Sequence, residues 1–460
     1  MNPVKPKSSR PNAFQGPRLR TVRVRALSLC LSTVGLSQVA ISAYAAPQIW
    51  TVKNCDDGGM DSLREIISNP MTLSGDIVDL RELPTRCGMA NSTITLLNGE
   101  IVVNQADLTL IGPAEGDGSV SISGGNASRV LNHRGLGSLN LQSLTIANGT
   151  YHVYGVPGDG YGGCINSEGS AYLNRTVVTD CDAFTNTGTG GGGGIRAPSV
   201  TLVLSRVSNS NEGAQGHISC GGGVKAHTLI AKYSSLSGNY GNRGGGACAD
   251  DITIIGSTID HNTAGFGGGL YAHSSAIVQN STLSGNGAVG GPALSGGPSG
   301  NAVTLSVVNS TITGNSGQGA IYFGGTSPSS SIELQSSIVA KNTAGVAQMP
   351  SDIYISPGSG MLDSAGTDNL VIASNVPSPP GVITVTSDPK LGPLQFNGGW
   401  TRTHALLPGS PALGMGNDTG SLTHDQRGVG YPRTSGPNAT TDIGAVQFDT
   451  IFAHGFGWAE

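Results

Sequence analysis

The amino-acid sequence predicts an all-β protein, a right-handed parallel β-helix solenoid with a short N-terminal capping helix. Three observations lead to this prediction. Glycine supplies 72 of the 460 residues and aromatic residues only 5%, so the chain cannot fill a conventional core with large side chains. Short β-branched segments return every 23 to 30 residues, and glycine runs separate them. A repeat of this length is typical of a solenoid in which each coil pairs with its neighbours.

The first segment, residues 1–45, has the features of a secretory signal peptide. It contains no acidic residue, an apolar run extends from Ala26 to Ile41, and Ala43 and Ala45 form a small-x-small cleavage site. Its seven basic residues are Lys5, Lys7, Arg10, Arg18, Arg20, Arg23 and Arg25. The apolar run is shorter than the ~20 residues that span a bilayer. We therefore expect an exported protein with no membrane span once the leader is removed.

The charge of the remaining chain excludes two classes of partner. Without the leader, the chain keeps 17 basic and 29 acidic residues, a net charge of −12. A surface this acidic repels phosphate backbones and anionic lipid. We therefore expect neither nucleic acid nor a membrane surface as a partner, and we expect a monomer without cofactor or metal.

Six cysteines remain after Cys30 leaves with the leader. An even number in an exported chain favours disulfides, and the cysteine spacing does not resemble a zinc site. Neighbours in the sequence suggest the pairs Cys55–Cys87, Cys164–Cys181 and Cys220–Cys248. Spacing alone leaves other pairings open.

Residues 46–138 are expected to form the N-terminal cap and the first coils. An open solenoid end would expose core and unpaired strand edges. A capping box at Ser62 and Glu65 begins a helix, and Pro70 ends it. The apolar face of this helix consists of Leu63, Ile66 and Ile67, which suits a helix lying over the first coil.

Residues 139–365 are expected to form the main parallel β-helix, because Ser/Thr-aliphatic-x-x-Asn recurs there in coil after coil. We predict that the aliphatic residues stack in one interior row and that the asparagines form an internal ladder. The aliphatic positions are Val177, Val207, Leu236, Ile259, Leu283 and Ile312, and the asparagines are Asn239, Asn262, Asn286 and Asn315. The sequence also matches glycosylation sequons that begin at Asn91, Asn280 and Asn309. Their regular placement favours coil geometry over glycosylation.

Both ends of the chain resemble known families. Residues 61–67, followed by residues 75–77, resemble the N-terminal CSLREA motif of exported bacterial β-helix proteins, with Asp61 at the family's first cysteine. The far end is similar to the choice-of-anchor Q domain. The motifs that carry this resemblance are Asp388-Pro389-Lys390-Leu391, Asn397-Gly398-Gly399-Trp400-Thr401-Arg402-Thr403-His404, Gly409-Ser410-Pro411-Ala412, Asp425-Gln426-Arg427-Gly428 and Asp442-Ile443-Gly444-Ala445-Val446.

The resemblance implies a pectate-lyase-like β-helix that is secreted or held at the outer surface of a bacterial cell. We expect C-terminal coils and a choice-of-anchor Q-like closing region over residues 366–449, and a short tail over residues 450–460. The Asp425 carboxylate beside Arg427 could suggest catalysis. An ion-paired closing loop is the simpler interpretation, because the planar guanidinium of arginine satisfies carboxylates and carbonyls in partly buried turns.

One group of titratable residues is a candidate site. When the coils are aligned by their glycine runs, His227, Asp250 and His273 share one outward register. Neighbouring coils lie ~4.8 Å apart, so these side chains could share protons or a metal. An adjacent column contains Lys225, Cys248 and Tyr271.

A catalytic hypothesis assigns roles to these residues. His227, Asp250, Tyr271 and His273 would be catalytic, with the Tyr271 phenol suited to proton abstraction from a uronic acid. The substrate-binding residues would be Lys225, His217 and Arg243. The alternative is that polar residues simply end strands at a solvent-facing corner, since polar columns and perturbed groups only sometimes mark a site.

Two functions remain open at this stage. The leading hypothesis is a secreted or cell-surface β-helix with a non-catalytic, glycan-binding, adhesive or structural role. The alternative is a polysaccharide lyase or glycosidase that acts in a groove near Tyr271. The fold alone does not decide, because unrelated functions share one architecture. An enzyme would require convergent titratable groups in a cleft.

Overall fold

A computed structural model describes residues 46–88, 90–115, 118–154, 160–186, 189–214, 219–297, 301–324, 327–363, 368–376, 382–384, 388–417, 422–434 and 440–448. The predicted signal peptide, the predicted tail at 450–460 and His217 lie outside these residues. In the part of the chain that is described, no helix is long and apolar enough to cross a membrane.

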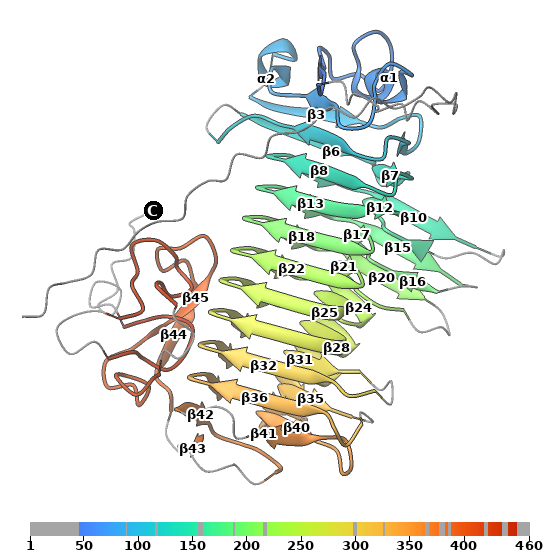
Figure 1. The fold of residues 1–460 in the computed structure, drawn as a ribbon. Coiled ribbons are helices and arrows are strands. Elements are labelled where there is room, and N and C mark those ends of the chain that lie inside the picture. The colour runs from blue at the N-terminus through green and yellow to red at the C-terminus, as the bar shows by residue number, and fades with distance from the viewer. Residues whose placement is uncertain are drawn as a thin grey trace, which may run out of the picture. The chain divides into compact units, whose positions relative to one another are not determined.

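Stacked coils form three parallel sheets, A, B and C, with 20, 12 and 9 strands. Most central coils run through two strands of sheet A, one of sheet B and one of sheet C, and a glycine run leads into the next coil (Figure 1). In two coils the sheet A strands are continuous, as β25 and β28. Among the named strands, only the pairs β38–β39 and β44–β45 are antiparallel. The predicted all-β, right-handed parallel β-helix is confirmed.

The strands of sheet A are β1 (Ile49–Thr51), β2 (Ile77–Asp79), β4 (Ile101–Val103), β5 (Leu108–Ile111), β7 (Leu131–His133), β8 (Ser138–Gln142), β12 (Ile165–Ser167), β13 (Ser170–Asn174), β17 (Ile195–Arg196), β18 (Ser199–Val203), β21 (Val224–Lys225), β22 (Thr228–Lys232), β25 (Ala247–Ile255), β28 (Leu270–Gln279), β31 (Leu294–Gly296), β32 (Thr304–Val308), β35 (Ile321–Phe323), β36 (Ser331–Gln335), β40 (Ile353–Ile355) and β41 (Met361–Asp363).

Sheet B contains β3 (Asn91–Thr95), β6 (Ser119–Ser123), β9 (Thr145–Ala147), β14 (Val177–Thr179), β19 (Arg206–Ser208), β23 (Ser235–Ser237), β26 (Thr258–Asp260), β29 (Thr282–Ser284), β33 (Thr311–Thr313), β37 (Ile338–Ala340), β42 (Asn369–Val371) and β43 (Val382–Thr384). Sheet C contains β10 (Thr150–Val153), β15 (Asp182–Thr185), β20 (Asn211–Ala214), β24 (Tyr240–Arg243), β27 (Thr263–Phe266), β30 (Gly287–Gly290), β34 (Ser316–Gln318), β38 (Thr343–Ala344) and β39 (Met349–Pro350). Two further pairs are β11 (Gly160–Tyr161) with β16 (Gly190–Gly191), and β44 (Leu391–Gln395) with β45 (Thr403–Leu406).

The predicted N-terminal helix is α1 (Leu63–Ser68). The Ser62 hydroxyl accepts a hydrogen bond from the Glu65 amide at 3.2 Å, which satisfies one of the free amides of the first turn. Its three apolar residues are buried, so the helix covers the first coils as expected. A second short helix, α2 (Leu83–Arg86), was not expected from the sequence.

The predicted aliphatic row is present, but one of its six residues differs from the prediction. Val207, Leu236, Ile259, Leu283 and Ile312 pair successively in sheet B and are fully buried. In the coil before them, Val178 pairs with Val207 and is buried, whereas Val177 pairs with Arg206 on the outer face. The prediction of Val177 was therefore wrong by one residue. Because strand side chains alternate, one step exchanges inside for outside.

The predicted asparagine ladder is confirmed and is longer than expected. The side-chain nitrogens of Asn239, Asn262 and Asn286 each donate to the side-chain oxygen of the next asparagine at 2.9–3.0 Å. Asn315 continues to Asn342, and Asn342 donates to the Asp352 carboxylate at 2.8 Å. The ladder lies in the interior, where an unpaired amide would be costly.

A second ladder of buried serines was not predicted. Each hydroxyl accepts from the backbone amide of the serine in the preceding coil, at 3.0–3.1 Å, through Ser205, Ser234, Ser257, Ser281, Ser310 and Ser337. Ser281 and Ser310 are the middle residues of two of the sequons. Their asparagines, Asn280 and Asn309, are buried, which favours the coil interpretation over glycosylation.

The corner between sheets A and B repeats one backbone conformation, and we name it the A–B corner. The residue just before each of the six ladder serines, and the equivalent residue before Leu144 and Thr176 in the two preceding coils, has a φ between 46° and 60°: Ser143, Arg175, Leu204, Tyr233, Gly256, Asn280, Asn309 and Ser336. L-residues rarely adopt this left-handed conformation. Here each corner is fixed by hydrogen bonds to the neighbouring coil, for example from the Arg175 amide to the Val203 carbonyl at 3.0 Å.

The three suggested disulfides are present: Cys55–Cys87, Cys164–Cys181 and Cys220–Cys248. Cys220 forms a parallel β-bridge with Gly191, and Cys248 lies in β25, 28 residues further along the chain. Each bond therefore joins segments that the coils already bring together.

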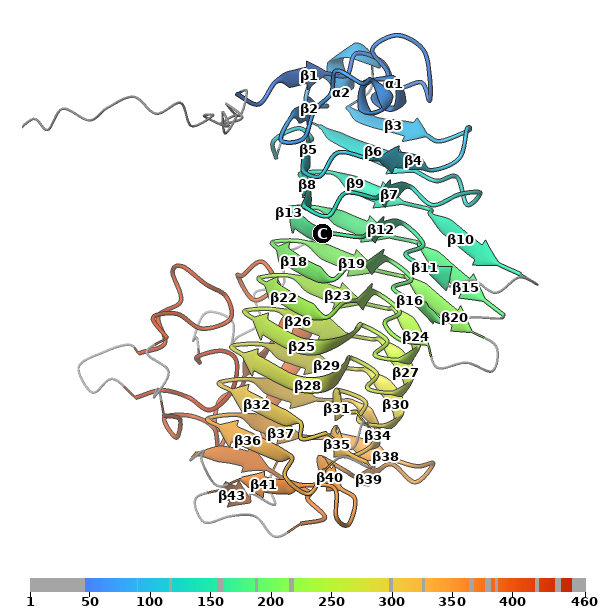
Figure 2. The same ribbon diagram turned by 45° about the vertical axis from the view of Figure 1, so that its right-hand side comes forward.

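The C-terminal region folds back along the outer face of sheet B (Figures 1 and 2). We call the described residues 388–417, 422–434 and 440–448 the C-terminal arm. Thr258 and Thr282 donate hydrogen bonds to the arm at 2.6 Å, and Thr311 accepts one at 3.0 Å. These threonines form one outward row of sheet B, so the arm joins coils instead of extending the solenoid.

The Asp425–Arg427 element is a buried ion pair, with 2.7 Å between carboxylate and guanidinium. Arg427 also donates to the Gln447 carbonyl at 3.0 Å. Asp442 accepts from the backbone amides of Gly414 and Phe448 instead of pairing with Arg427. The ion-paired closing loop is therefore present, and its structural role stays a prediction.

Replacing a ladder asparagine is expected to destabilise the solenoid. In Asn286→Ala, the Ile259 carbonyl and the Asn262 amide lose a buried partner, which should lower the free energy of unfolding by about 3–5 kcal/mol. Denaturant unfolding followed by circular dichroism measures the change. Asn242→Ala, at an exposed position of β24, is the control, and equal midpoints for the two variants would contradict the ladder's role.

Removing the Cys220–Cys248 bridge is expected to lower stability by about 3–4 kcal/mol in the chain-entropy model, since the bond closes a separation of 28 residues. The double variant Cys220→Ala/Cys248→Ala tests this by thermal unfolding. Peptide mapping of the unreduced parent protein provides the control. A free thiol at either position would refute the pairing.

Candidate functional site

The predicted triad of titratable residues comes together on the outer face of sheet A. Nδ1 of His227 lies 2.8 Å from one Asp250 oxygen, and Nδ1 of His273 lies 3.5 Å from the other. The pairing of β25 with β28 shifts in register between Ala249 and Asp251, which lets Asp250 lie between the two imidazoles. The sequence alignment of these three coils is therefore confirmed, while their catalytic role stays a prediction.

Tyr271 lies beside His273, with ring centroids 5.2 Å apart, but its side chain is covered. Only 1% of the residue is exposed. Arg243 lies over the ring at 5.4 Å, and Gly297 lies against the hydroxyl end. Burial raises the pKa of the Tyr271 phenol to about 12. No described residue hydrogen-bonds to this hydroxyl. The catalytic hypothesis requires a phenol that reaches the substrate, whereas the described residues cover the Tyr271 phenol.

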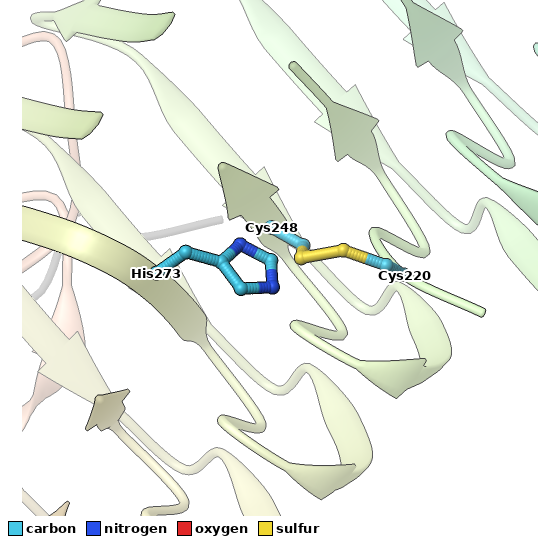
Figure 3. A group of neighbouring side chains, drawn as sticks. All are labelled: Cys220, Cys248 and His273. Carbon is cyan, nitrogen blue, oxygen red and sulfur yellow. A yellow bond between two sulfur atoms is a disulfide. The ribbon is translucent and has the colours of Figure 1, made fainter. Parts of the chain in front are cut away.

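Beside His273 lies the Cys220–Cys248 disulfide (Figure 3). The ring nitrogen of His273 and the two sulfur atoms lie within 4.8 Å of one another. Metal binding by cysteine requires thiolates, and both sulfurs are consumed by the bond. In the oxidised protein this group therefore offers a metal a single nitrogen, which is too few ligands for a site.

The three predicted substrate-binding residues differ in outcome. Lys225 donates from Nζ to the Gly190 carbonyl at 3.1 Å and lies 4.5 Å from the centre of the Tyr161 ring. Arg243 lies over the Tyr271 ring and so helps to cover the proposed catalytic phenol. His217 lies outside the described residues. None of the three is tested as a ligand contact.

We call His227, Asp250 and His273, with the neighbouring Tyr271, the histidine strip. The electrostatics of the histidine strip favour a structural role. Burial lowers the pKa of His273, and the nearby Asp250 carboxylate only partly opposes that effect. Burial thus favours the neutral imidazole of His273, whose Nδ1 lies 3.5 Å from an Asp250 oxygen and has no hydrogen-bond partner among the described residues. Among the described residues, the phenol that would complete a base and acid pair here is covered, whereas a catalytic site is recognised by titratable groups that converge on an open cleft.

A different concavity lies where the arm meets the A–B corner. This groove has a volume of about 550 Å³. Its floor includes Ser143, Arg175, Leu204 and Tyr233 of the A–B corner, and its wall includes Phe396, Trp400 and Arg402 of the arm. We call it the corner groove. It lies within the size range of ligand pockets in proteins.

The floor of the groove continues the surface on which the arm docks. The row of threonines bound by the arm pairs, toward the N-terminus, with Ser235, then Arg206, then Val177. The corner is used in the same way. Gly256 and Asn280 bond to the arm, whereas Arg175 and Tyr233 lie in the open part.

The wall of the groove is the loop between β44 and β45, residues 396–402. Asn397 is buried and donates to the Thr403 carbonyl at 3.0 Å. A Cβ at Gly398 would lie against the Tyr431 hydroxyl, and one at Gly399 would lie 2.6 Å from Arg427 Cα. The motif therefore needs both glycines, and the same packing holds Trp400 in place.

Aromatic and cationic groups face one another across the groove. Trp400 is 55% exposed, Phe396 67% and Tyr233 37%. The Arg175 guanidinium lies 5.8 Å from the centre of the Trp400 ring, within the range of a cation–π contact. Arg402 is already bound to Asp260 at 2.6 Å. Glu115 is the acidic residue among those that line the groove.

The sequence analysis did not identify this site. The Asn397–His404 motif was assigned only to a closing region, and nothing in the sequence singled out Arg175 or Arg206. Two signals were available: an exposed-type tryptophan in a glycine-bounded loop, and two arginines near the same corner of adjacent coils in an acidic chain. What the sequence could not supply was the position of the arm beside the A–B corner.

Comparison with known proteins supports the fold alone. No family model matches the chain, and no curated protein matches it either. The resemblance to the CSLREA motif and to the choice-of-anchor Q domain therefore stays a prediction. Among solved structures, the chain is similar to the crystal structure of pectate lyase Pel9A, with a TM-score of 0.52 and 12% identity over 89% of this chain and 98% of that chain. At this identity the similarity defines a pectate-lyase-like β-helix and no activity.

Removing the Tyr271 hydroxyl is expected to have little effect. Because that hydroxyl is buried without a described partner, Tyr271→Phe should leave the melting temperature unchanged or slightly higher. Tyr271→Ala should lose about 3–5 kcal/mol through the cavity it leaves. Thermal unfolding and assays on polysaccharides measure both. An activity that disappears in a stable Tyr271→Phe protein would restore the catalytic hypothesis.

Proposed function

We propose that this protein is an exported, non-catalytic polysaccharide-binding β-helix whose ligand lies in the corner groove. The observation that carries the proposal is the set of three partly exposed aromatic rings, Trp400, Phe396 and Tyr233, around one open groove. Large aromatic side chains on a surface normally cost solubility and mark binding sites. Sugar rings present flat apolar faces that such rings can cover.

Export is supported by the leader sequence and by the disulfides. Residues 1–45 have the composition of a signal peptide. Three disulfides are typical of oxidising, extracellular surroundings and are rare inside cells. The pectate-lyase-like fold agrees with a ligand of the polysaccharide class, since the similar solved structure is that of a pectate lyase.

Binding without catalysis is favoured over a polysaccharide lyase by the contrast between the two sites. The histidine strip has titratable groups but covers its phenol. The corner groove has open space, and its described lining residues include one carboxylate, that of Glu115, and no histidine. A long polysaccharide can be held by shape and stacking alone, so the groove needs no convergent acid and base.

Trp400→Ala is expected to weaken polysaccharide binding at least about tenfold, since stacking and burial of an indole contribute one or more kcal/mol. The measurement is isothermal titration of the mature chain against a panel of acidic and neutral polysaccharides, with product analysis for unsaturated sugars. No product is expected.

Tyr240→Ala serves as the matched control, because Tyr240 is similarly exposed but lies on sheet C. Two results would refute the proposal. One is the absence of binding to every polysaccharide in the panel. The other is binding that Trp400→Ala leaves unchanged while the variant remains folded.

A further inference from the structure

We infer that the corner groove selects polysaccharides that carry carboxylates, and that Arg175 and Arg206 recognise the uronic acid residues. This inference rests on the proposed function and adds the class of ligand. It depends on three features of the described residues: two arginines without acidic partners, their positions on adjacent coils, and an exposed tryptophan beside one of them.

The two arginines differ from most others in the described chain. Six arginines lie within 4.0 Å of a carboxylate: Arg64, Arg81, Arg86, Arg129, Arg402 and Arg427. Arg175 and Arg206 are exposed, and neither has an ion-pair partner among the described residues. In a mature chain of net charge −12, carboxylates are plentiful, so two unpaired arginines in one groove leave their bonding capacity for a ligand.

The coil geometry fixes the backbone positions of Arg175 and Arg206. Arg206 pairs with Val177, which is two residues after Arg175. The two arginines therefore lie on adjacent coils, whose spacing is about 4.8 Å, and are offset by two residues along the strand. The Arg175 amide bonds to the Val203 carbonyl and the Arg206 amide to the Thr176 carbonyl, at 3.0 and 2.9 Å. Both side chains therefore project from a backbone fixed on each side, which reduces the entropy lost on binding.

Trp400 places the sugar ring next to this charge. Its indole is 5.8 Å from the Arg175 guanidinium. A pyranose that lies on the exposed indole face would bring a substituent of its ring within reach of that guanidinium. A carboxylate is the substituent that matches the planar guanidinium with two parallel hydrogen bonds. A neutral hydroxymethyl group offers no such match.

The length of the groove favours a polymer over a single sugar. Its lining runs from the loop at Pro113 through Ser143, Arg175 and Leu204 to Tyr233. These positions belong to five successive coils, which cover roughly 19 Å at about 4.8 Å per step.

The acidic surface elsewhere works against non-selective binding of polyanions. Long-range repulsion weakens the approach of any polyanion to a chain of this charge. Only a ligand that also stacks on Trp400 and fits the groove gains enough contact to offset it. The inference is therefore of a carboxylated sugar polymer and excludes anions in general.

The test uses two polymers that differ in charge and share a backbone. Titration of the mature chain with polygalacturonate and with its fully methyl-esterified form isolates the effect of the carboxylate. The unmodified protein is expected to bind the acidic form at least about tenfold more tightly, since hydrogen bonds to charged groups are roughly twice as strong as neutral ones. Dextran sulfate provides a polyanion without carboxylates and should bind weakly.

The variants separate the inference from the proposed function. Arg175→Gln/Arg206→Gln should lose the preference for the acidic polymer and keep binding to the esterified one. Trp400→Ala should weaken both. Arg134→Gln removes an exposed arginine on a turn of sheet A outside the groove lining and should change neither.

Three outcomes would overturn the inference. Equal affinity of the unmodified protein for the acidic and esterified polymers would leave polysaccharide binding intact and remove the carboxylate selectivity. Dextran sulfate binding as tight as that of polygalacturonate would show a general ion contact. A preference that survives in the Arg175→Gln/Arg206→Gln protein would place recognition elsewhere. Absence of binding to all polymers would instead defeat the proposed function.

Discussion

The register of this molecule depends on hydrogen bonds between buried polar side chains of successive coils. In each rung the asparagine lies three residues after its aliphatic neighbour, as in Leu236 and Asn239 or Ile312 and Asn315. The ladder serine lies two residues before that aliphatic residue. This short unit is constant, while the rest of the coil varies in length. Because a slip of one residue would bury unpaired amides, the unit fixes the stacking more strictly than apolar contacts can.

The last rung shows why the ladder ends in a carboxylate. Asp352 accepts from the Asn342 side chain with one oxygen and from the backbone amides of Ile372 and Ala373 with the other. An asparagine at position 352 would direct its side-chain NH₂ group, a donor, toward the two backbone amides, which are also donors. Burial raises the pKa of Asp352, although these hydrogen bonds oppose that effect. The ladder thus changes from asparagine to aspartate at the position where no further asparagine follows and backbone amides become the donors.

Sequence reasoning succeeded where periodicity determines structure. The anchors from Val207 to Ile312 and the asparagines from Asn239 to Asn315 were found because their environment repeats, and local repeats have local causes. It erred at Val177, where the motif lacks its asparagine and nothing in the sequence distinguished Val177 from Val178. Tyr271 was placed beside His273 correctly, but its burial depends on Arg243 and Gly297, which come from other coils.

The arm changes how this solenoid can behave as it folds. Contacts in a repeat protein are confined to neighbouring coils, so its parts can order almost independently. The arm instead joins residues far apart in sequence, as in the bond from Gln426 to Ser257 across 169 positions. Such contacts form late, because loop closure must precede them. The corner groove needs both the β-helix and the docked arm, so under the proposed function a polysaccharide would bind only to molecules in which the arm has docked.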